Sequence, residues 1–378
     1  RPRRAVLALA ASVLCLGQSS AQTVGTPPPA RDPARAIDVE VEALRAKYAL
    51  PALAGVLVDA EGRVVEGGFA GTTVAAGERA VSAESRWHLG SCTKAMTATL
   101  AAIDVQAERI AWDASPVEVL GALAGDGDDW APHPSWTAVT LAQLLSHTAG
   151  APTHEDLPIA WLAAGPPADA RAELVRTVLA RPLDGEPGQS YRYSNLGYVV
   201  AGTMLEAVGE GTYEERLQRE LFAPLGITSA GFGPPAGEAD PEGHRALEAG
   251  PAAIGRGARA DNPAAVAPAG TVHMTLADWG RFLGMHLRTG TGEGDLLEPE
   301  AFEALREVRR EDYALGWLVV QRAWSEGPVL HHAGSNTYWF ATVWAAPQEG
   351  RAALVCTNIA TDSARAAADA LVGRLLAR

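Results

Sequence analysis

The chain holds a serine and a lysine three residues apart, Ser91 and Lys94, at the start of an apolar segment that continues to about Ile103. This alanine-rich segment predicts a buried helix, and residues three apart on a helix share one face, with Cβ atoms roughly 5–6 Å apart. Burial lowers the pKa of a lysine, and a neutral amine can take a proton from a hydroxyl. The first helical turn also favours developing negative charge. The pair therefore has the chemistry of an activated serine nucleophile.

Lysine is rare in this chain, and this supports a chemical role for Lys94. Of the 31 basic residues, only Lys47 and Lys94 are lysine, and the other 29 are arginine. Arginine does not deprotonate in proteins, so it cannot replace a lysine whose proton must leave. The alternative is that Lys94 is an exposed residue in a first helical turn.

A second candidate group surrounds Tyr193 and Asn195. In an extended segment, residues two apart point the same way, so both side chains would face one site. A tyrosine hydroxyl near a lysine can share or relay its proton, and an asparagine amide can both donate to and accept from a substrate amide. The alternative is that Ser194 or Asn195 caps the helix that follows and that the tyrosines only pack.

A third group, His331, His332, Gly334 and Ser335, lies between two expected strands. Gly334 would let a substrate backbone approach closely, and the N–H groups of Ser335 and Ser91 could form an oxyanion hole. The two histidines are also an alternative metal pair, but neighbours on a strand face opposite ways. No third ligand stands at a suggestive spacing, so we expect no metal here.

Taken together, these residues resemble the penicillin-recognising serine hydrolases, which include cephalosporinase-type β-lactamases, D-alanyl-D-alanine carboxypeptidases and related esterases. That family carries S-x-x-K, a Y-x-N or S-D-N motif, and K-T-G, in this order. The counterparts here are Ser91-x-x-Lys94, Tyr193-Ser194-Asn195 and His332-Ala333-Gly334. Segments 144–150, 267–270 and 315–317 are also similar, and the resemblance runs from about Ile37 to the C-terminus.

The resemblance implies an acyl-enzyme formed without metal or cofactor. It implies Ser91 as the nucleophile and Lys94 with Tyr193 as the proton-transfer pair. Asn195 and the strand that carries His332, Gly334 and Ser335 would hold the substrate. We expect the partner to be a small-molecule or peptide substrate.

His332 departs from the family pattern, because it replaces the lysine of K-T-G. A histidine with an unperturbed pKa near 6.5 is mostly neutral at pH 7 and is a poor permanent charge for a substrate carboxylate. If His332 binds carboxylates only when protonated, KM for such substrates should rise between pH 5.5 and 8. We therefore expect hydrolysis of an ester, amide or D-amino-acid peptide bond in preference to β-lactam hydrolysis.

Two other classes of function remain as alternatives. A non-catalytic peptidoglycan-binding relative could keep the fold, but it would need no intact set of Ser91, Lys94 and Tyr193. A metal hydrolase could use His331 and His332, and a chelator would then inhibit it.

Strand patterns lie at both ends of the chain and helical patterns lie between them. Expected strands are a hairpin over 52–69 and segments 314–321, 328–333, 337–345 and 351–358. Expected helices are 38–49, 140–150, 194–208, 212–222, 275–288 and 362–377, while 121–136 and 231–270 show no regular pattern. We expect an α+β fold of the β-lactamase/transpeptidase type, a hydrolase domain over 37–378. An antiparallel sheet subdomain from about 37–90 and 270–378, flanked by helices, would carry an inserted, mainly helical subdomain over about 91–269.

Residues 1–21 have the pattern of a secretion signal, and 22–36 are rich in Pro and small residues, as a flexible linker would be. We expect a secreted or periplasmic protein after cleavage near Ala21. Cys15 suggests a lipidation site, but Leu14 before it is too large for good lipoprotein cleavage. No other segment is long and apolar enough to span a membrane.

The formal net charge of −14 argues against nucleic acid as a partner. Beyond the expected signal the chain has two cysteines, Cys92 and Cys356. A disulfide between them is the less favoured alternative. A cysteine in a buried helix more often fills a small apolar space.

His147 stands in the segment 140–150 and is a further candidate. A histidine just before a turn that ends a helix is more often a packing residue than a catalytic one, so we favour packing for His147.

Overall fold

The computed structural model describes residues 36–123, 130–153, 166–288 and 295–378. The expected signal and nearly all of the expected linker, and residues 124–129 of the expected loop 121–136, lie outside these ranges. Residues Ala34–Arg378 form one compact unit.

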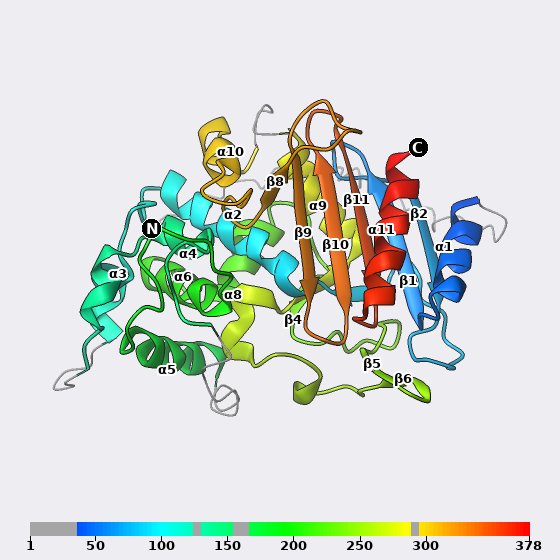
Figure 1. The fold of residues 1–378 in the computed structure, drawn as a ribbon, viewed down its shortest axis with the longest axis horizontal. Helices are drawn as coiled ribbons and strands as arrows, with labels where there is room; N and C mark the ends of the chain where they lie inside the picture. The colour runs from blue at the N-terminus through cyan, green and yellow to red at the C-terminus, as the bar shows by residue number, and fades with distance from the viewer. Residues whose placement is uncertain (1–35, 124–129, 154–165, 289–294) are drawn as a thin grey trace, which may run out of the picture. The chain divides into compact units, whose positions relative to one another are not determined.

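A six-stranded antiparallel sheet forms the frame of this unit (Figure 1). Its strand order is β2-β1-β11-β10-β9-β8, so strands from both ends of the chain lie side by side. The strands are β1 (Ala52–Val58), β2 (Val64–Gly71), β8 (Leu318–Val320), β9 (Val329–Ser335), β10 (Phe340–Ala346) and β11 (Arg351–Thr357). The central register runs from Leu53↔Thr357 to Val58↔Ala352. This confirms the expected α+β fold with an antiparallel sheet built from N- and C-terminal segments.

Helices cover both faces of the sheet, which explains why all seven residues of β1 are buried. On one face lie α1 (Ala36–Lys47) and α11 (Asp362–Leu376), and on the other lies α9 (Leu276–Arg288) (Figure 1). Alternate residues of β1 follow the pleat: Leu53 packs with α1 and α11, and Val56 packs in the main core. Because the Ala and Gly residues of β1 are small, the helices can pack close to this strand.

The helical insertion begins at Ser91, the candidate nucleophile. Its longest helices are α2 (Thr93–Gln106) and α6 (Asn195–Val208). Helix α2 runs from the sheet into the insertion (Figure 1), and its residues 93–102 are all buried, as the apolar pattern predicts. The shorter helices are α3 (Pro116–Leu120), α4 (Leu141–Leu145), α5 (Pro167–Leu179), α7 (Tyr213–Arg216) and α8 (Ala267–Gly270), and α10 (Pro299–Arg306) follows α9.

The structure differs from expectation at several boundaries. Helix α4 ends at Leu145 although a helix over 140–150 was expected, because the chain turns at His147 with φ +59°. Helices α5 and α10 were not expected, and neither has a side-chain cap at its N-terminus to mark its start. The segment 231–270, expected to be irregular, contains α8 and three short strands. These are β4 (Gly231–Phe232), β5 (His244–Leu247) and β6 (Gly250–Ala253), and β4 joins β7 (Val272–Thr275) and β3 (Arg86–His88) in a small sheet.

Two further findings concern the cysteines and the membrane. Cys92 and Cys356 are both free and buried, so the disulfide alternative is wrong. Within the described ranges, none of the helices has the length and apolar character needed to cross a bilayer.

Candidate active site

Ser91 lies in a tight turn just before the long helix. Gly90–Cys92 form one 3-10 turn and α2 begins at Thr93, so Ser91 precedes the regular helix by two residues. Gly90 has φ +51°, a conformation that favours glycine. A Cβ at Gly90 would also lie 2.4 Å from the backbone nitrogen of Ser335. The turn that carries Ser91 therefore packs directly against the end of β9.

Lys94 is completely buried beneath Ser91. Its Nζ lies 3.1 Å from Ser91 Oγ, 2.8 Å from Asn195 Oδ1 and 2.6 Å from the carbonyl oxygen of Ala269. Burial lowers the pKa of Lys94 well below its ordinary value. A neutral amine has two N–H groups and one lone pair. It can donate to the side-chain oxygen of Asn195 and to the carbonyl oxygen of Ala269, and it can accept from the Ser91 hydroxyl.

Tyr193 also contacts Ser91, and its ring centroid lies 4.8 Å from Lys94 Nζ. Its hydroxyl donates to Ser91 Oγ at 2.7 Å, although 38% of the residue remains exposed at its outer edge. Burial of the hydroxyl raises the pKa of Tyr193, so the phenol keeps its proton at neutral pH. Ser91 Oγ can therefore accept from Tyr193 while it donates to Lys94.

Ser194 and Asn195 each fulfil one of the two predictions made for their segment. The Ser194 side chain accepts from the N–H of Gly197 at 3.1 Å and caps α6, as the alternative predicted. Asn195 and Tyr193 nevertheless both face Ser91, as the two-residue spacing predicts.

His147 lies behind Tyr193 and does not reach Ser91. Its ring centroid is 4.2 Å from that of Tyr193, and its Nδ1 accepts from the N–H of Ser194 at 3.1 Å. The residue is buried, and burial lowers its pKa well below its ordinary value. This is the packing role that we favoured.

His332 does not line the cavity beside Ser91. It is 4% exposed, its Nδ1 donates to the carbonyl of Ala333 at 2.8 Å, and its Nε2 accepts from the Tyr313 hydroxyl at 3.0 Å. Burial lowers the pKa of His332 to about 3. The ring is therefore neutral across the whole range from pH 5.5 to 8. This differs from the expectation of a histidine that gains charge there and binds a substrate carboxylate.

His331 faces the opposite side of the sheet and stacks on Trp344, with ring centroids 3.8 Å apart. The two histidines therefore do not converge on one point. Among the described residues no group of three His, Cys, Asp or Glu side chains could hold a metal ion.

Gly334 and Ser335 belong to β9 itself, although β9 was expected to end at residue 333. A Cβ at Gly334 would lie 2.1 Å from the carbonyl oxygen of Leu89 and 2.6 Å from the backbone nitrogen of Ser91. The close packing of the Ser91 turn against β9 therefore requires glycine here. The backbone of Ser335 reaches the same turn, as a paired oxyanion hole would need.

A cavity of about 280 Å³, here called the Ser91 cavity, opens above these groups. It is lined by Ser91, Tyr193, Asn195, Asn262, Pro263, Val266, Ala269, Gly270, Ser335, Asn336 and Thr337. None of these residues is charged. Four of the lining residues were not expected as site residues: Asn262, Pro263, Val266 and Thr337. The only sequence signal near them was segment 267–270, which is similar to the family.

Comparisons with known proteins agree with this geometry. The sequence profile of the Beta-lactamase family matches residues 37–378. Penicillin-binding protein 4 from Amycolatopsis lactamdurans is 26% identical over 84% of this chain and 83% of its own length. Lovastatin esterase from Penicillium rubens is 33% identical over 39% of each chain, so this chain spans well under half of that relative.

The fold also matches solved structures. The crystal structure of D-alanine carboxypeptidase AmpC from Burkholderia cenocepacia superposes with a TM-score of 0.68 and 19% identity, over 90% of this chain and 98% of that chain. At this identity the likeness shows the fold, and the family rests on the profile match across residues 37–378. The chain belongs to the Beta-lactamase family of serine hydrolases.

Proposed function

We propose that this protein is an exported serine hydrolase that forms an acyl-enzyme at Ser91 and cleaves uncharged ester or amide bonds, including D-amino-acid peptide bonds. The observation that carries the proposal is the surroundings of Lys94 Nζ. Two fixed acceptors and one hydroxyl meet a fully buried amine, which suits the neutral form. Such an amine is a general base for the Ser91 hydroxyl.

In the acylation step, Ser91 Oγ attacks the substrate carbonyl carbon and its proton passes to Lys94 Nζ. The backbone N–H groups of Ser91 and Ser335 stabilise the oxyanion. As the bond to the leaving group breaks, Tyr193 gives its proton to the leaving atom and Lys94 returns a proton to Tyr193. In the second step, water attacks the acyl carbon and loses its proton through Tyr193 to Lys94. As the bond from the acyl carbon to Ser91 Oγ then breaks, Lys94 gives this proton to Ser91 Oγ, which releases the acid and regenerates the hydroxyl and the neutral amine.

The chemistry of the Ser91 cavity supports uncharged substrates. Its lining offers amide, hydroxyl and apolar groups and no cationic side chain. His332, at the position of the family's K-T-G lysine, is neutral and turned toward Tyr313. A substrate carboxylate would therefore lose its water without gaining a charged partner.

The second candidate is binding and hydrolysis of β-lactams or of D-alanyl-D-alanine ends. It is favoured by the match to penicillin-binding protein 4 over most of both chains. The two candidates differ in whether a free carboxylate on the substrate helps.

The test uses a matched pair of substrates, an acyl-D-alanyl-D-alanine peptide and its C-terminal amide, together with p-nitrophenyl esters and nitrocefin. We expect kcat/KM for the peptide amide to equal or exceed that for the free acid, and the esters to be turned over. Intact-mass analysis should show an acyl adduct that peptide mapping places on Ser91 and that is absent from Ser91→Ala. A tenfold preference for the free acid would favour the second candidate, and an adduct on another residue would refute the mechanism.

We also propose that the protein is exported, because residues 1–21 have the pattern of a secretion signal. N-terminal sequencing of the protein recovered from its native cells should find a start near Gln22. A chain that retains Arg1, or that stays in the cytoplasm, would contradict this.

A further inference from the structure

A buried carboxylate lies next to the Ser91 cavity without lining it. The side chain of Asp261 is 1% exposed, and its Oδ2 lies 2.7 Å from His88 Nε2. Its Oδ1 accepts from the side-chain amide of Asn336 at 2.8 Å and from the N–H of Asn262 at 2.7 Å. Each carboxylate oxygen therefore has at least one N–H donor.

These contacts determine which nitrogen of His88 carries the proton. His88 Nδ1 accepts from the backbone N–H of Gly90 at 3.1 Å, so Nδ1 holds a lone pair. In a neutral imidazole the other nitrogen is then the donor, and Nε2–H points at Asp261. The side chain of His88 is 0% exposed and its ring stacks on Trp339, with centroids 5.5 Å apart. Asp261 therefore fixes the tautomer of His88, and that tautomer fixes the amide of Gly90.

Gly90 is the residue before the nucleophile. Its backbone has φ +51° and packs against the nitrogen of Ser335. The direction of its amide sets the turn from which the Ser91 hydroxyl and N–H project. Asn336 directly follows Ser335 in the chain, and its side-chain amide donates to the same Asp261 carboxylate. One buried carboxylate thus contacts side chains from both segments that flank the proposed oxyanion hole.

We propose that Asp261 and His88 are positioning residues for acyl transfer at Ser91. Asp261 holds His88 as the Nε2–H tautomer, and His88 Nδ1 holds the Gly90 amide in the orientation that aims Ser91 at the substrate. Neither residue touches the reacting atoms. This inference rests on the proposed function, because it assigns a role in the same reaction.

The substitution Asp261→Asn tests the tautomer directly. The position of Oδ1 receives two N–H donors and that of Oδ2 receives one. An asparagine therefore places its oxygen at the first position and its NH₂ toward His88. His88 Nε2 must then accept, its proton moves to Nδ1, and the bond from Gly90 is lost. We expect the acylation rate to fall about 10²-fold, the scale for misplaced reacting groups, and KM to change by less than about threefold.

Asp240→Asn is the matched control. Asp240 is also a buried carboxylate bound to strand β3, where it accepts from the N–H of Arg86 at 2.9 Å and from its guanidinium at 2.6 Å. It makes no contact with Gly90 in these hydrogen bonds. We expect Asp240→Asn to lower the unfolding temperature while the acylation rate per competent site stays within about twofold of wild type.

The measurement is single-turnover acylation by p-nitrophenyl acetate, normalised to the fraction of Ser91 adduct seen by intact mass. In parallel, ¹⁵N NMR of histidine-labelled protein reports the tautomer, with the His88 signal assigned by its loss in His88→Gln. Wild type should show a neutral Nε2–H ring, and Asp261→Asn should show Nδ1–H. If Asp261→Asn does not fold, His88→Gln serves instead. It removes the ring Nδ1 that accepts from the N–H of Gly90, so the acylation rate should fall similarly.

A wild-type His88 that is Nδ1–H or doubly protonated would overturn the inference. An Asp261→Asn rate within twofold of wild type, with Ser91 still labelled, would overturn the inference alone and leave the proposed function intact. Absence of any Ser91 adduct in the wild-type protein would overturn the proposed function, and the positioning role with it.

Discussion

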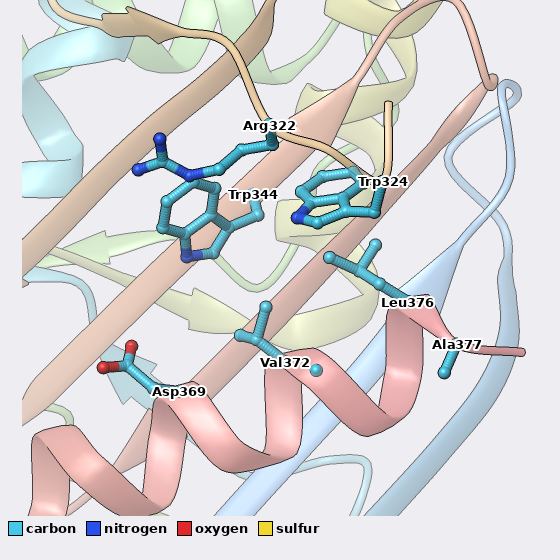
Figure 2. A pocket seen from close by; sticks show the side chains of 8 residues that line it. Arg322, Trp324, Trp344, Asp369, Val372, Leu376 and Ala377 are labelled. Carbon is cyan, nitrogen blue, oxygen red and sulfur yellow. The ribbon is translucent and has the colours of Figure 1, made fainter. Parts of the chain in front are cut away.

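Strand β9 presents two neighbouring histidines to opposite faces of the sheet, and the two faces are built on different principles. On the inner face, His332 is buried between its own backbone and the Tyr313 hydroxyl. On the outer face, His331 donates from Nδ1 to the Val343 carbonyl at 2.9 Å and stacks on Trp344. Beyond Trp344 a second cavity of about 460 Å³ opens against α11, with Trp324 at its edge (Figure 2).

The difference lies in how much each polar atom is constrained. On the inner face, Lys94 and His332 have fixed partners and little water, so burial shifts their pKa values far from ordinary. On the outer face, contacts are stacked rings and a guanidinium over an indole, and Trp324 is 37% exposed. The inner face is suited to proton transfer, and the outer face contributes mainly packing. Substitutions of single residues on the two faces test this difference.

The largest expected effect is the loss of acylation in Lys94→Arg. The variant places a permanently charged guanidinium where the neutral amine stood, and so removes the proton-accepting state. We expect it to stay folded and to lose acylation about 10²–10⁴-fold, the usual worth of general acid–base assistance. The control is Lys47→Arg, which changes the other lysine, on α1, and should leave the rate unchanged. The measurement is the rate of adduct formation on Ser91, and near-normal turnover by folded Lys94→Arg would remove the mechanism.

Tyr193→Phe should have the next largest effect. It removes the hydroxyl that donates to Ser91 Oγ at 2.7 Å but keeps the ring against His147. We expect kcat to fall about 10²-fold, with little change in the unfolding temperature. The control is Tyr191→Phe, because Tyr191 packs edge-on against His147 but does not line the Ser91 cavity. Equal losses of kcat in the two variants would show that the hydroxyl of Tyr193 has no specific role in the reaction.

Acid stability should separate the two histidines. The pKa of His332 is about 3 when folded and near 6.5 when unfolded. Between these values the unfolded chain binds a proton that the folded protein does not, so stability falls as pH drops from 6.5 toward 3. The slope from one such group is at most about 1.4 kcal/mol per pH unit.

The measurement is the unfolding midpoint at several pH values from 7 to 4. We expect His332→Gln to reduce the loss of stability at low pH more than His331→Gln does, because His332 is buried and His331 is only partly buried. Equal pH dependence in both variants would contradict the contrast between the faces.

The smallest expected effect is on Arg322→Ala at the outer face. The Arg322 guanidinium lies 4.8 Å from the Trp344 ring centroid. Such a contact is worth about 0.5–1 kcal/mol at an exposed site, so the unfolding free energy should fall by that amount or less. The kcat/KM for esters should stay within twofold. A tenfold loss of activity would show that the outer face acts on the reaction.

The sequence predicted the parts of the site that depend on spacing within one segment. Ser91 and Lys94 share a helix face, and Tyr193 and Asn195 share a side of an extended segment, so their facing directions follow from local geometry. The family resemblance then brought the segments together. The sheet was equally predictable, because its strands show clear apolar patterns at both ends of the chain.

What the sequence could not show depends on contacts between distant segments. The orientation of the His332 ring depends on its hydrogen bond with the Tyr313 hydroxyl. No local sequence pattern identifies these two residues as partners. Likewise, Asp261 and His88 lie 173 residues apart. Asn262 and Pro263 form a cavity wall only because the irregular segment 254–263 folds over the site.

The pairing of β1 with β11 also governs when activity can begin. The N–H of Ala52 donates to the side chain of Asn358, 306 residues later in the chain, at 2.9 Å. During synthesis, the segment with Ser91 leaves the ribosome long before β9 can supply Gly334 and Ser335. Contacts of such long range close slowly. A growing chain therefore carries Ser91 before β9 exists to pack against its turn, and any hydrolysis at Ser91 has to wait until β9 has been made and paired.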